Sequence, residues 1–158
     1  ARKSAHIMHD IDGYDKQILK LLRQNGRLTN QELGELVGLS ASQISRRRIH
    51  LEQQKYIIGY SARISPAALN LDISSVLEIT LAEASPEAVT AFYELVKRTP
   101  AILDMYKTTG NADFILKVAV AELSDLSALI SDLAAHKTVG HIRTAVVLER
   151  LKEDGVWL

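Results

Sequence analysis

The first 60 residues contain three stretches in which apolar side chains recur every three or four positions. This spacing is typical of amphipathic helices that bury one narrow face. The positions predicted to be buried are Tyr14, Ile18, Leu21 and Leu22 in the first helix, Leu33, Leu36 and Val37 in the second, and Ile44 and Leu51 in the third. The pair Asn25-Gly26 follows the first stretch and predicts where that helix ends.

The second and third helices each begin with a hydroxyl residue that is followed three positions later by Glu or Gln. Thr29 with Glu32, and Ser40 with Gln43, fit the capping box, in which the side chain of each residue satisfies the backbone N–H of the other. Gly38-Leu39 lies between the two helices and is predicted to be the turn. Two short helices joined in this way are typical of a helix-turn-helix, although capping boxes also occur in ordinary helical hairpins.

Charge is distributed unevenly along the chain. The 19 Lys and Arg balance the 19 Asp and Glu, but residues 1–60 have a net charge of +4 and residues 61–158 a net charge of −4. The run Arg46-Arg47-Arg48 lies within the third predicted helix. Such a run is often only a solvated surface, but soon after a capped helix start it favours a helix that enters the major groove of DNA.

The second part of the chain has a different pattern. A β-branched and aromatic stretch at 57–64 predicts a linking strand, and strands are then predicted at 77–81, 102–108, 114–120 and 141–151. Helices are predicted to begin at Ser85-Pro86 and at Ser124 or Asp125. The resulting order, βαββαβ, is that of a ferredoxin-like sheet with helices on one face. The other face of such a sheet needs a partner, so self-association is expected.

Composition excludes several kinds of chemistry. The chain has no cysteine, so it can form no disulfide and offers no thiolate to a metal. Its five histidines belong to no HExxH or Cys/His ligand set, and it has no P-loop lysine or nucleophile elbow. We therefore expect no metal site, no cofactor and no enzyme activity. No apolar run approaches the ~20 residues of a membrane span, and the first residues lack a signal-peptide core, so a cytoplasmic, nucleoid-associated protein is expected.

Several short motifs follow one another from about Asp12 to the end of the chain. They are Asp15-Xaa-Xaa-Ile18-Leu19, Asn25-Gly26-Arg27, Gly38-Leu39-Ser40, Arg47 with Leu51-Glu52, Ile58-Gly59-Tyr60, Pro66, Thr109-Gly110-Xaa-Xaa-Asp113-Phe114 and Thr144-Ala145-Val146-Val147-Leu148. In this order and spacing the chain resembles the Lrp/AsnC, or feast/famine, family of transcriptional regulators. The resemblance implies a winged-type helix-turn-helix, a C-terminal domain that senses amino acids, and dimers that often assemble into octamers.

Three positions depart from the usual pattern of that family. Arg48 stands where a small or β-branched core residue is usual, and Ile49 where a polar residue is usual. Lys55 replaces the glycine that usually ends the recognition helix, so either the helix ends differently or a non-glycine residue adopts a left-handed conformation. Asn111 replaces the first carboxylate of the usual Gly-Asp-Xaa-Asp loop, which puts the usual ligand preference in doubt.

The predicted DNA-binding residues lie at the start of the second helix and along the third. The set is Thr29, Asn30, Ser40, Ser42, Gln43, Ser45, Arg46, Arg47 and His50. The beginning of a recognition helix enters the groove deepest, which places Ser42 and Gln43 near base edges. Arg46 and Arg47 are expected on guanine edges or phosphates, and the helix start at 29–30 is expected to hold a phosphate through its backbone amides.

The predicted effector site is the loop between the strands at 102–108 and 114–120. The set is Tyr106, Thr108, Thr109, Gly110, Asn111, Ala112 and Asp113. Gly110 allows a ligand carboxylate to approach the backbone amides closely, and Asp113 is expected to accept a hydrogen bond from an α-ammonium group. The alternative is a plain hairpin turn in which Asn111 takes a positive φ and Asp113 bonds its own backbone.

The predicted fold class is α+β, a winged-type helix-turn-helix joined by a strand linker to a ferredoxin-like βαββαβ domain. The helix-turn-helix is expected at 10–56, the linker at 57–72, and an effector-sensing and oligomerisation domain at 73–158. The predicted function is sequence-specific transcriptional regulation that responds to a small effector, expected to be an amino acid. The expected partners are double-stranded DNA, further copies of the chain as dimers or octamers, and the effector, with no membrane. An architectural protein that wraps DNA with little sequence choice, and an enzyme subunit with an allosteric second domain, are the alternatives.

Overall fold

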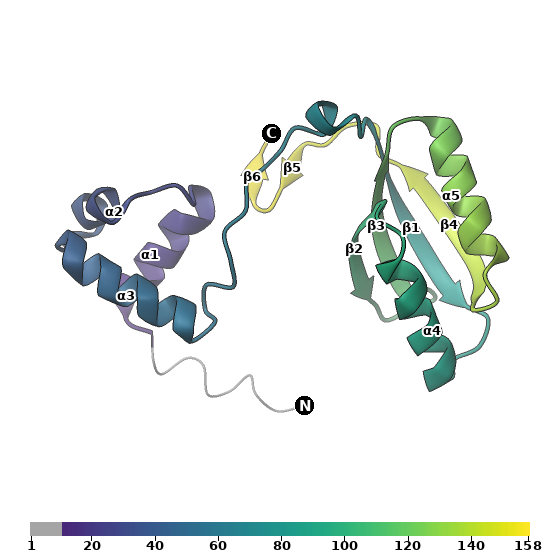
Figure 1. Cartoon of the computed structure of the whole chain (residues 1–158), viewed down its shortest axis with the longest axis horizontal. Helices are drawn as coiled ribbons and strands as arrows, with labels where there is room; N and C mark the ends of the chain where they lie inside the picture. The colour runs from purple at the N-terminus through teal and green to yellow at the C-terminus, as the bar shows by residue number, and fades with distance from the viewer. Residues whose placement is uncertain (1–10) are drawn as a thin grey trace. The chain divides into compact units, whose positions relative to one another are not determined.

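A computed structural model describes residues 11–158, which belong to two compact units, one ending at Arg63 and the other spanning Ile64–Leu158 (Figure 1). Residues 1–10, where the sequence lacks a signal-peptide core, lie outside the described part. The first unit consists of the helices α1 (Gly13–Gln24), α2 (Asn30–Val37) and α3 (Ala41–Gln53). Both predicted capping boxes are confirmed, because Thr29 and Ser40 each accept from the N3 backbone N–H and the N3 side chains accept in return. The predicted turn is also confirmed, with Gly38 at φ 84°.

The three helices bury a small apolar core between them. Its fully buried members are Ile18, Leu33, Ile44 and Leu51. The predictions that Tyr14 and Leu36 are buried are wrong, since their side chains are 45% and 61% exposed. The short helix α2 buries the face that carries Leu33 and Val37, and Leu36 lies about 100° from Val37 around the helix. Close packing explains Gly34, where an added Cβ would lie only 2.4 Å from the carbonyl oxygen of Leu39.

The segment that follows α3 is not a strand. Among residues 11–72 the structure contains no strand, so the strand predicted at 57–64 is absent from the single chain. The physical reason is that a strand needs a neighbour to accept its backbone hydrogen bonds, and none of the described residues pairs with this segment. Its apolar side chains are accordingly exposed, Ile58 to 91%. A 3₁₀ turn at Pro66–Leu69 leads into the second unit.

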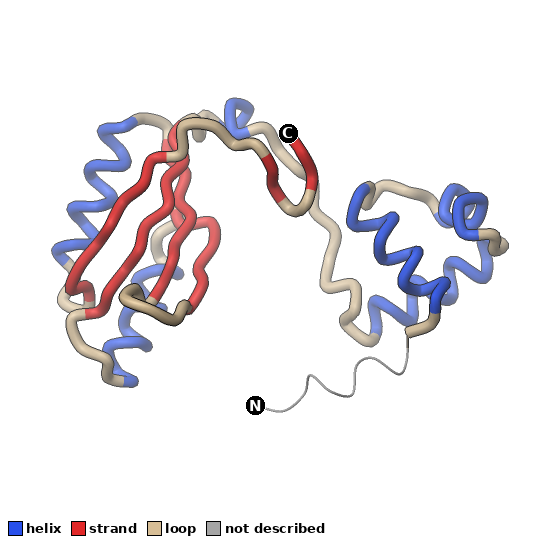
Figure 2. The backbone as a smooth tube through the Cα atoms, turned by 180° about the vertical axis from the view of Figure 1, so that it is seen from behind, coloured by secondary structure: helices blue, strands red, loops and turns tan. Residues whose placement is uncertain are grey.

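The second unit is a four-stranded antiparallel sheet with two helices on one face (Figure 2). Its elements are β1 (Ile73–Leu81), α4 (Pro86–Lys97), β2 (Ile102–Lys107), β3 (Phe114–Val120), α5 (Leu123–Ala135) and β4 (Val139–Val146). The strand order is β2-β3-β1-β4, so the first and third strands lie at the centre. This arrangement confirms the predicted ferredoxin-like fold.

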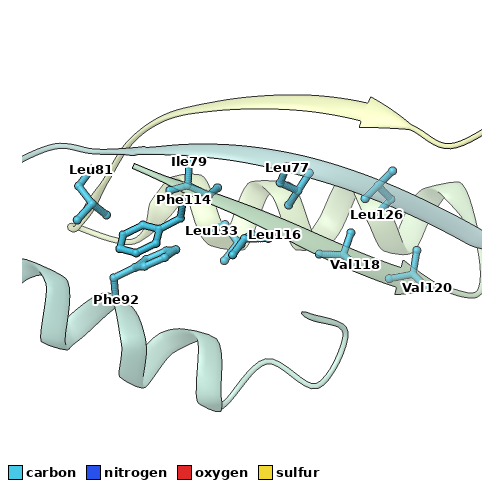
Figure 3. Close-up of a cluster of buried hydrophobic side chains, with 10 residues drawn as sticks. All are labelled: Leu77, Ile79, Leu81, Phe92, Phe114, Leu116, Val118, Val120, Leu126 and Leu133. Atoms are coloured by element: carbon cyan, nitrogen blue, oxygen red, sulfur yellow. The ribbon is translucent and has the colours of Figure 1, made fainter. Parts of the chain in front are cut away.

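The core of the second unit lies between the sheet and the helices (Figure 3). Alternate residues of β1 and β3 point toward the helices, and the rings of Phe92 on α4 and Phe114 on β3 stack with their centroids 5.2 Å apart. The side chains of Glu78 and Ile115, which are register partners, lie on the opposite face and are half-buried. That face carries no helix, as Figure 2 shows, and it is the face on which the candidate ligand site lies.

The C-terminus differs from the prediction of one long strand. The strand β4 ends at Val146, and a small hairpin of β5 (Lys152–Glu153) and β6 (Val156–Trp157) follows. An ion pair between Lys117 on β3 and Glu153 ties this hairpin to the sheet. Trp157 stays 73% exposed.

Candidate functional site

The outward face of α3 is the side of the helix that points away from the core of the helix-turn-helix. Six side chains, spaced three or four residues apart, share it and line a shallow depression of about 460 Å³: Ser42, Ser45, Arg46, Ile49, His50 and Gln53. The opposite face of the helix holds Ile44 and Leu51 in the core. Arg46 is exposed and has no ion-pair partner among residues 11–158. An exposed polar helix face with an arginine that forms no ion pair is typical of a helix that binds in the major groove of DNA.

Arg47 points in another direction and holds the unit together. Its guanidinium donates to the carboxylates of Asp12, at 2.7 Å, and Asp15, at 3.0 Å, and lies 5.3 Å from the ring centre of Tyr14. The contact with both carboxylates raises the pKa of Arg47. The pKa of Asp12 is lowered, first by the hydrogen bond it accepts from the backbone of Asp15 and then by Arg47. This geometry argues against the predicted contact of Arg47 with DNA, because its guanidinium is already bound between α3 and the start of α1.

Arg48 ties the end of the unit to the start of α2. Its guanidinium donates to the carbonyl of Leu28, at 3.0 Å, and the side-chain oxygen of Asn30, at 3.2 Å. Its Nε donates to the hydroxyl of Tyr60, whose ring lies below the guanidinium, and Tyr60 in turn donates to Glu52. Burial raises the pKa of this tyrosine. The chain reaches Tyr60 because Lys55 adopts φ 61°, which confirms that a non-glycine residue takes the left-handed conformation.

Five other predicted DNA-binding residues already have side-chain partners within the unit. The hydroxyls of Thr29 and Ser40 serve as helix caps, and the side-chain oxygen of Gln43 accepts from the backbone of Ser40. Asn30 accepts from Arg48, and the hydroxyl of Ser42 lies 3.1 Å from that of Ser40. These side-chain contacts leave the predicted phosphate contact through the backbone amides at 29–30 as a prediction. Of the predicted set, Ser42, Ser45, Arg46 and His50 share the outward face of α3. Sequence reasoning missed Ile49 and Gln53, although helical spacing from Ser42 and Arg46 identifies both.

The loop between β2 and β3 is anchored to the central strand β1. The backbone N–H of Leu81 donates to the Asp113 carboxylate at 2.7 Å, and the N–H of Asp113 donates to the carbonyl of Ile79. Thr108 closes the loop by donating from its hydroxyl to the carbonyl of Ala112. Gly110, not Asn111, takes the positive φ, at 98°. The Asp113 carboxylate therefore fastens the loop to β1, and this argues against its predicted contact with a ligand ammonium group.

A cavity of about 890 Å³ lies beside this loop on the face of the sheet that carries no helix. Its lining contains four predicted residues, Thr108, Thr109, Asn111 and Ala112. It also contains residues from all four strands that sequence reasoning missed: Glu78, Thr80, Lys107, Ile115, His141 and Arg143. Tyr106 lies along a second depression with the C-terminal hairpin. On β1 and β4 the sequence contains a signal for the missed polar residues, since Glu78, Thr80, His141 and Arg143 alternate with residues of the core. Lys107 has no such signal, because Met105, two positions earlier on β2, packs against the core.

The charges around the cavity are of both signs. Lys107 and Arg143 are cationic, and Glu78 lies 3.5 Å from Arg143 across the pair of strands β1 and β4. A zwitterion such as an amino acid presents one charge of each sign, so it matches this lining.

Residues 11–158 contain no cluster of three or more His, Cys, Asp or Glu side chains suited to a metal ion. None of the helices in the same range combines the length and apolarity that a membrane crossing requires.

A helix-turn-helix with an exposed polar helix face, followed by a separate domain with a polar cavity, is the arrangement of a transcription regulator with a ligand-binding domain. The family models agree with both assignments. Residues 11–52 match the AsnC-type helix-turn-helix domain, and residues 74–157 match the Lrp/AsnC ligand binding domain. The chain belongs to the Lrp/AsnC family of transcriptional regulators.

Curated relatives and solved structures support the same assignment. The chain is 33% identical over 146 residues to the leucine-responsive regulatory proteins of Escherichia coli K12 and Klebsiella pneumoniae, covering 92% of this chain and 89% of each relative. A transcriptional regulator of Neisseria meningitidis, solved in complex with L-methionine, is similar with a TM-score of 0.86 and 31% identity over 90% of this chain and 93% of that one. An AsnC family regulator of Agrobacterium tumefaciens has a TM-score of 0.84 and 26% identity over 90% and 94%. All of these relatives are named as regulators.

Proposed function

We propose that this chain binds specific DNA sequences through the outward face of α3 and that an amino acid, bound at the loop of residues 108–112, modulates that binding. The observation that carries the DNA-binding part is the open helix face with Arg46 and His50, set on a framework that Arg47 and Arg48 hold rigid. Guanidinium and imidazole groups on such a face can donate to base edges and phosphates. A regulator of this kind acts on the genome, so we place it at the nucleoid.

Binding to a library of random genomic fragments tests the DNA-binding part. A sequence-specific regulator enriches a few fragments strongly, and footprinting on those fragments then shows discrete protected half-sites about one helical turn apart. An architectural protein coats fragments without enrichment, and an enzyme subunit with an allosteric domain retains none. Either of these two results would contradict the proposal.

The effector part is supported by the lining of the cavity. Glu78 is placed to accept from an α-ammonium group, while Lys107 and Arg143 can hold a carboxylate. Asp113 keeps the loop in place and is assigned no direct contact. The regulator of Neisseria meningitidis, whose fold this chain shares, was solved with L-methionine, which supports an amino acid as the class of ligand.

A thermal-shift screen of the twenty amino acids tests this part. An effector at 100 times its dissociation constant stabilises the folded protein by about 2.7 kcal/mol, which is readily measured. Glu78→Gln is expected to abolish the shift, whereas Glu83→Gln, an exposed carboxylate outside the cavity lining, is the matched control and keeps it. If no amino acid stabilises the protein, or if Glu78→Gln responds as the parent does, the proposed site is wrong.

We also propose that the working form is a dimer or a larger assembly. The supporting features are the sheet face without helices and exposed apolar side chains such as Ile58, Leu148 and Trp157. The segment 57–64, extended and without a partner in the chain, can pair with the same segment of a second copy. Sedimentation at micromolar concentration is expected to show at least a dimer. A single 17.5 kDa species would contradict this proposal.

A further inference from the structure

One large apolar side chain lies in the middle of the otherwise polar outward face of α3. Ile49 is 51% exposed, and Ser45, Arg46 and Gln53 lie one turn before and after it. All of these residues line the same depression of about 460 Å³. Ile49 is therefore presented outward together with the residues assigned to DNA.

Folding of the unit does not account for this isoleucine. The buried contacts of α3 come from Ile44 and Leu51, and Ile49 is not among the apolar residues that pack against their cluster. A β-branched residue is also a weaker helix former than the Gln, Lys or Arg that usually fill an exposed helix position. An isolated exposed isoleucine is common on protein surfaces, but this one occupies the centre of the surface that faces the groove.

The edges of base pairs in the major groove offer one methyl group, the C5-methyl group of thymine. The other bases are distinguished there by hydrogen-bond donors and acceptors, and the hydroxyl, guanidinium and amide groups around Ile49 can pair with those. An isoleucine at the centre of the face buries more of its apolar surface against that methyl group than against cytosine, which has only a hydrogen at the same ring position.

We infer that Ile49 is a specificity-determining residue that reads the methyl group of one thymine in each DNA half-site. This inference rests on the proposed function, because it requires that α3 enters the major groove in a sequence-specific complex. It extends that function by naming a base and the chemical group recognised. The neighbouring polar residues are expected to read the flanking base pairs, so the thymine occupies an inner position of the half-site.

The test uses a DNA duplex selected from a random-sequence library by the full chain, with each thymine replaced in turn by uracil. This replacement keeps base pairing and every hydrogen-bonding group and removes only the methyl group. Burial of one methylene-sized group contributes about 0.8 kcal/mol, so uracil at the position read by Ile49 is expected to weaken binding about fourfold. Replacement in both half-sites is expected to weaken binding of a dimer about fifteenfold. Other thymines are expected to have little effect.

Three variants assign the effect to this residue. Ile49→Ser removes the apolar group and is expected to bind the thymine and uracil duplexes equally, while Ile49→Val keeps two methyl groups and retains part of the difference. Leu36→Ser is the matched control, since Leu36 is also exposed but lies on α2, and it is expected to keep the full difference. Because both positions are exposed, all three variants are expected to fold, which thermal unfolding checks.

The possible results separate the inference from the function on which it rests. If the library yields no enriched sequence, the chain does not read DNA by sequence, and both fail. If a sequence is enriched but contains no methyl-sensitive thymine, the assignment of Ile49 is wrong and sequence-specific binding stands. The assignment is equally wrong if Ile49→Ser keeps the full thymine–uracil difference.

Discussion

Replacement of Arg47 by alanine is expected to weaken the fold of the helix-turn-helix without changing how many phosphates it contacts. Arg47 binds two carboxylates at 2.7 and 3.0 Å, and its side chain is 26% exposed while that of Asp15 is only 8% exposed. A hydrogen bond to a charged group contributes about 1.5–3 kcal/mol, and truncation also leaves the Asp15 carboxylate buried without its cation. We discount the more exposed contact with Asp12 and expect a loss of about 2–3 kcal/mol. For a unit of this size the melting temperature then falls by roughly 10–20 °C.

Arg46→Ala is the matched variant, one residue away on the same helix. Arg46 is exposed and lies on the outward face, so its removal is expected to change stability by no more than about 0.5 kcal/mol. If Arg46 contacts a phosphate, Arg46→Ala is expected to reduce the magnitude of the slope of log K for DNA binding against log salt concentration by about 1 per subunit. Calorimetry and DNA titrations at several salt concentrations measure the two quantities. If Arg47→Ala were as stable as the parent and lowered the salt slope, the reasoning would be refuted.

Three further predictions concern the same unit. Lys55→Gly is expected to raise stability by about 0.5–1 kcal/mol, since glycine adopts φ 61° without strain; a lower melting temperature would contradict this. Gly34→Ala is expected to unfold or distort the turn, because its Cβ would lie 2.4 Å from the Leu39 carbonyl, whereas Gly26→Ala, with contacts at 3.8 Å, should remain folded by circular dichroism. The pKa of Asp12 is lower in the folded protein than its ordinary value of 3.8, so the ionised carboxylate stabilises the fold at any pH above 3.8. This contribution disappears as the pH falls from 3.8 through the folded-state pKa. In acid titrations the difference in unfolding free energy between the parent and Asp12→Asn should therefore shrink as the pH falls below 3.8.

Local signals in the sequence were sufficient to predict most of the fold. The capping boxes at Thr29 and Ser40 and the turn at Gly38 all depend on interactions within a few residues, and the structure has each of them. The strand at 57–64 failed because its existence depends on a partner that the single chain does not supply. The prediction that Leu36 is buried was wrong because the spacing of apolar residues identifies only a helix face. The position of the neighbouring helix decides which edge of that face is buried.

The candidate sites were harder to predict than the fold, because the partners of a polar side chain come from distant positions. The sequence of the loop predicts that Asp113 contacts the ligand. In the structure its carboxylate accepts a hydrogen bond from the backbone of Leu81, 32 residues earlier in the chain. Glu78 and Arg143 meet only because β1 and β4 pair in the sheet. The alternation along each strand indicates that their side chains face outward, but the strand order that joins them is a property of the whole domain.

The run of three arginines shows why charge along a sequence differs from charge on a surface. Successive residues of a helix point about 100° apart, so Arg46, Arg47 and Arg48 cannot share one face. The structure directs the first outward, the second to the carboxylates at the start of α1 and the third to the start of α2. Two of the three cations therefore connect the helices, and the outward face of α3, which we propose binds DNA, presents one arginine, one histidine and several neutral groups. Since non-specific affinity comes almost wholly from phosphate contacts, such a face gives weak binding to arbitrary DNA and leaves discrimination to the base edges. A steep salt dependence that remained in Arg46→Ala would show that phosphate contacts elsewhere dominate, as the architectural alternative requires.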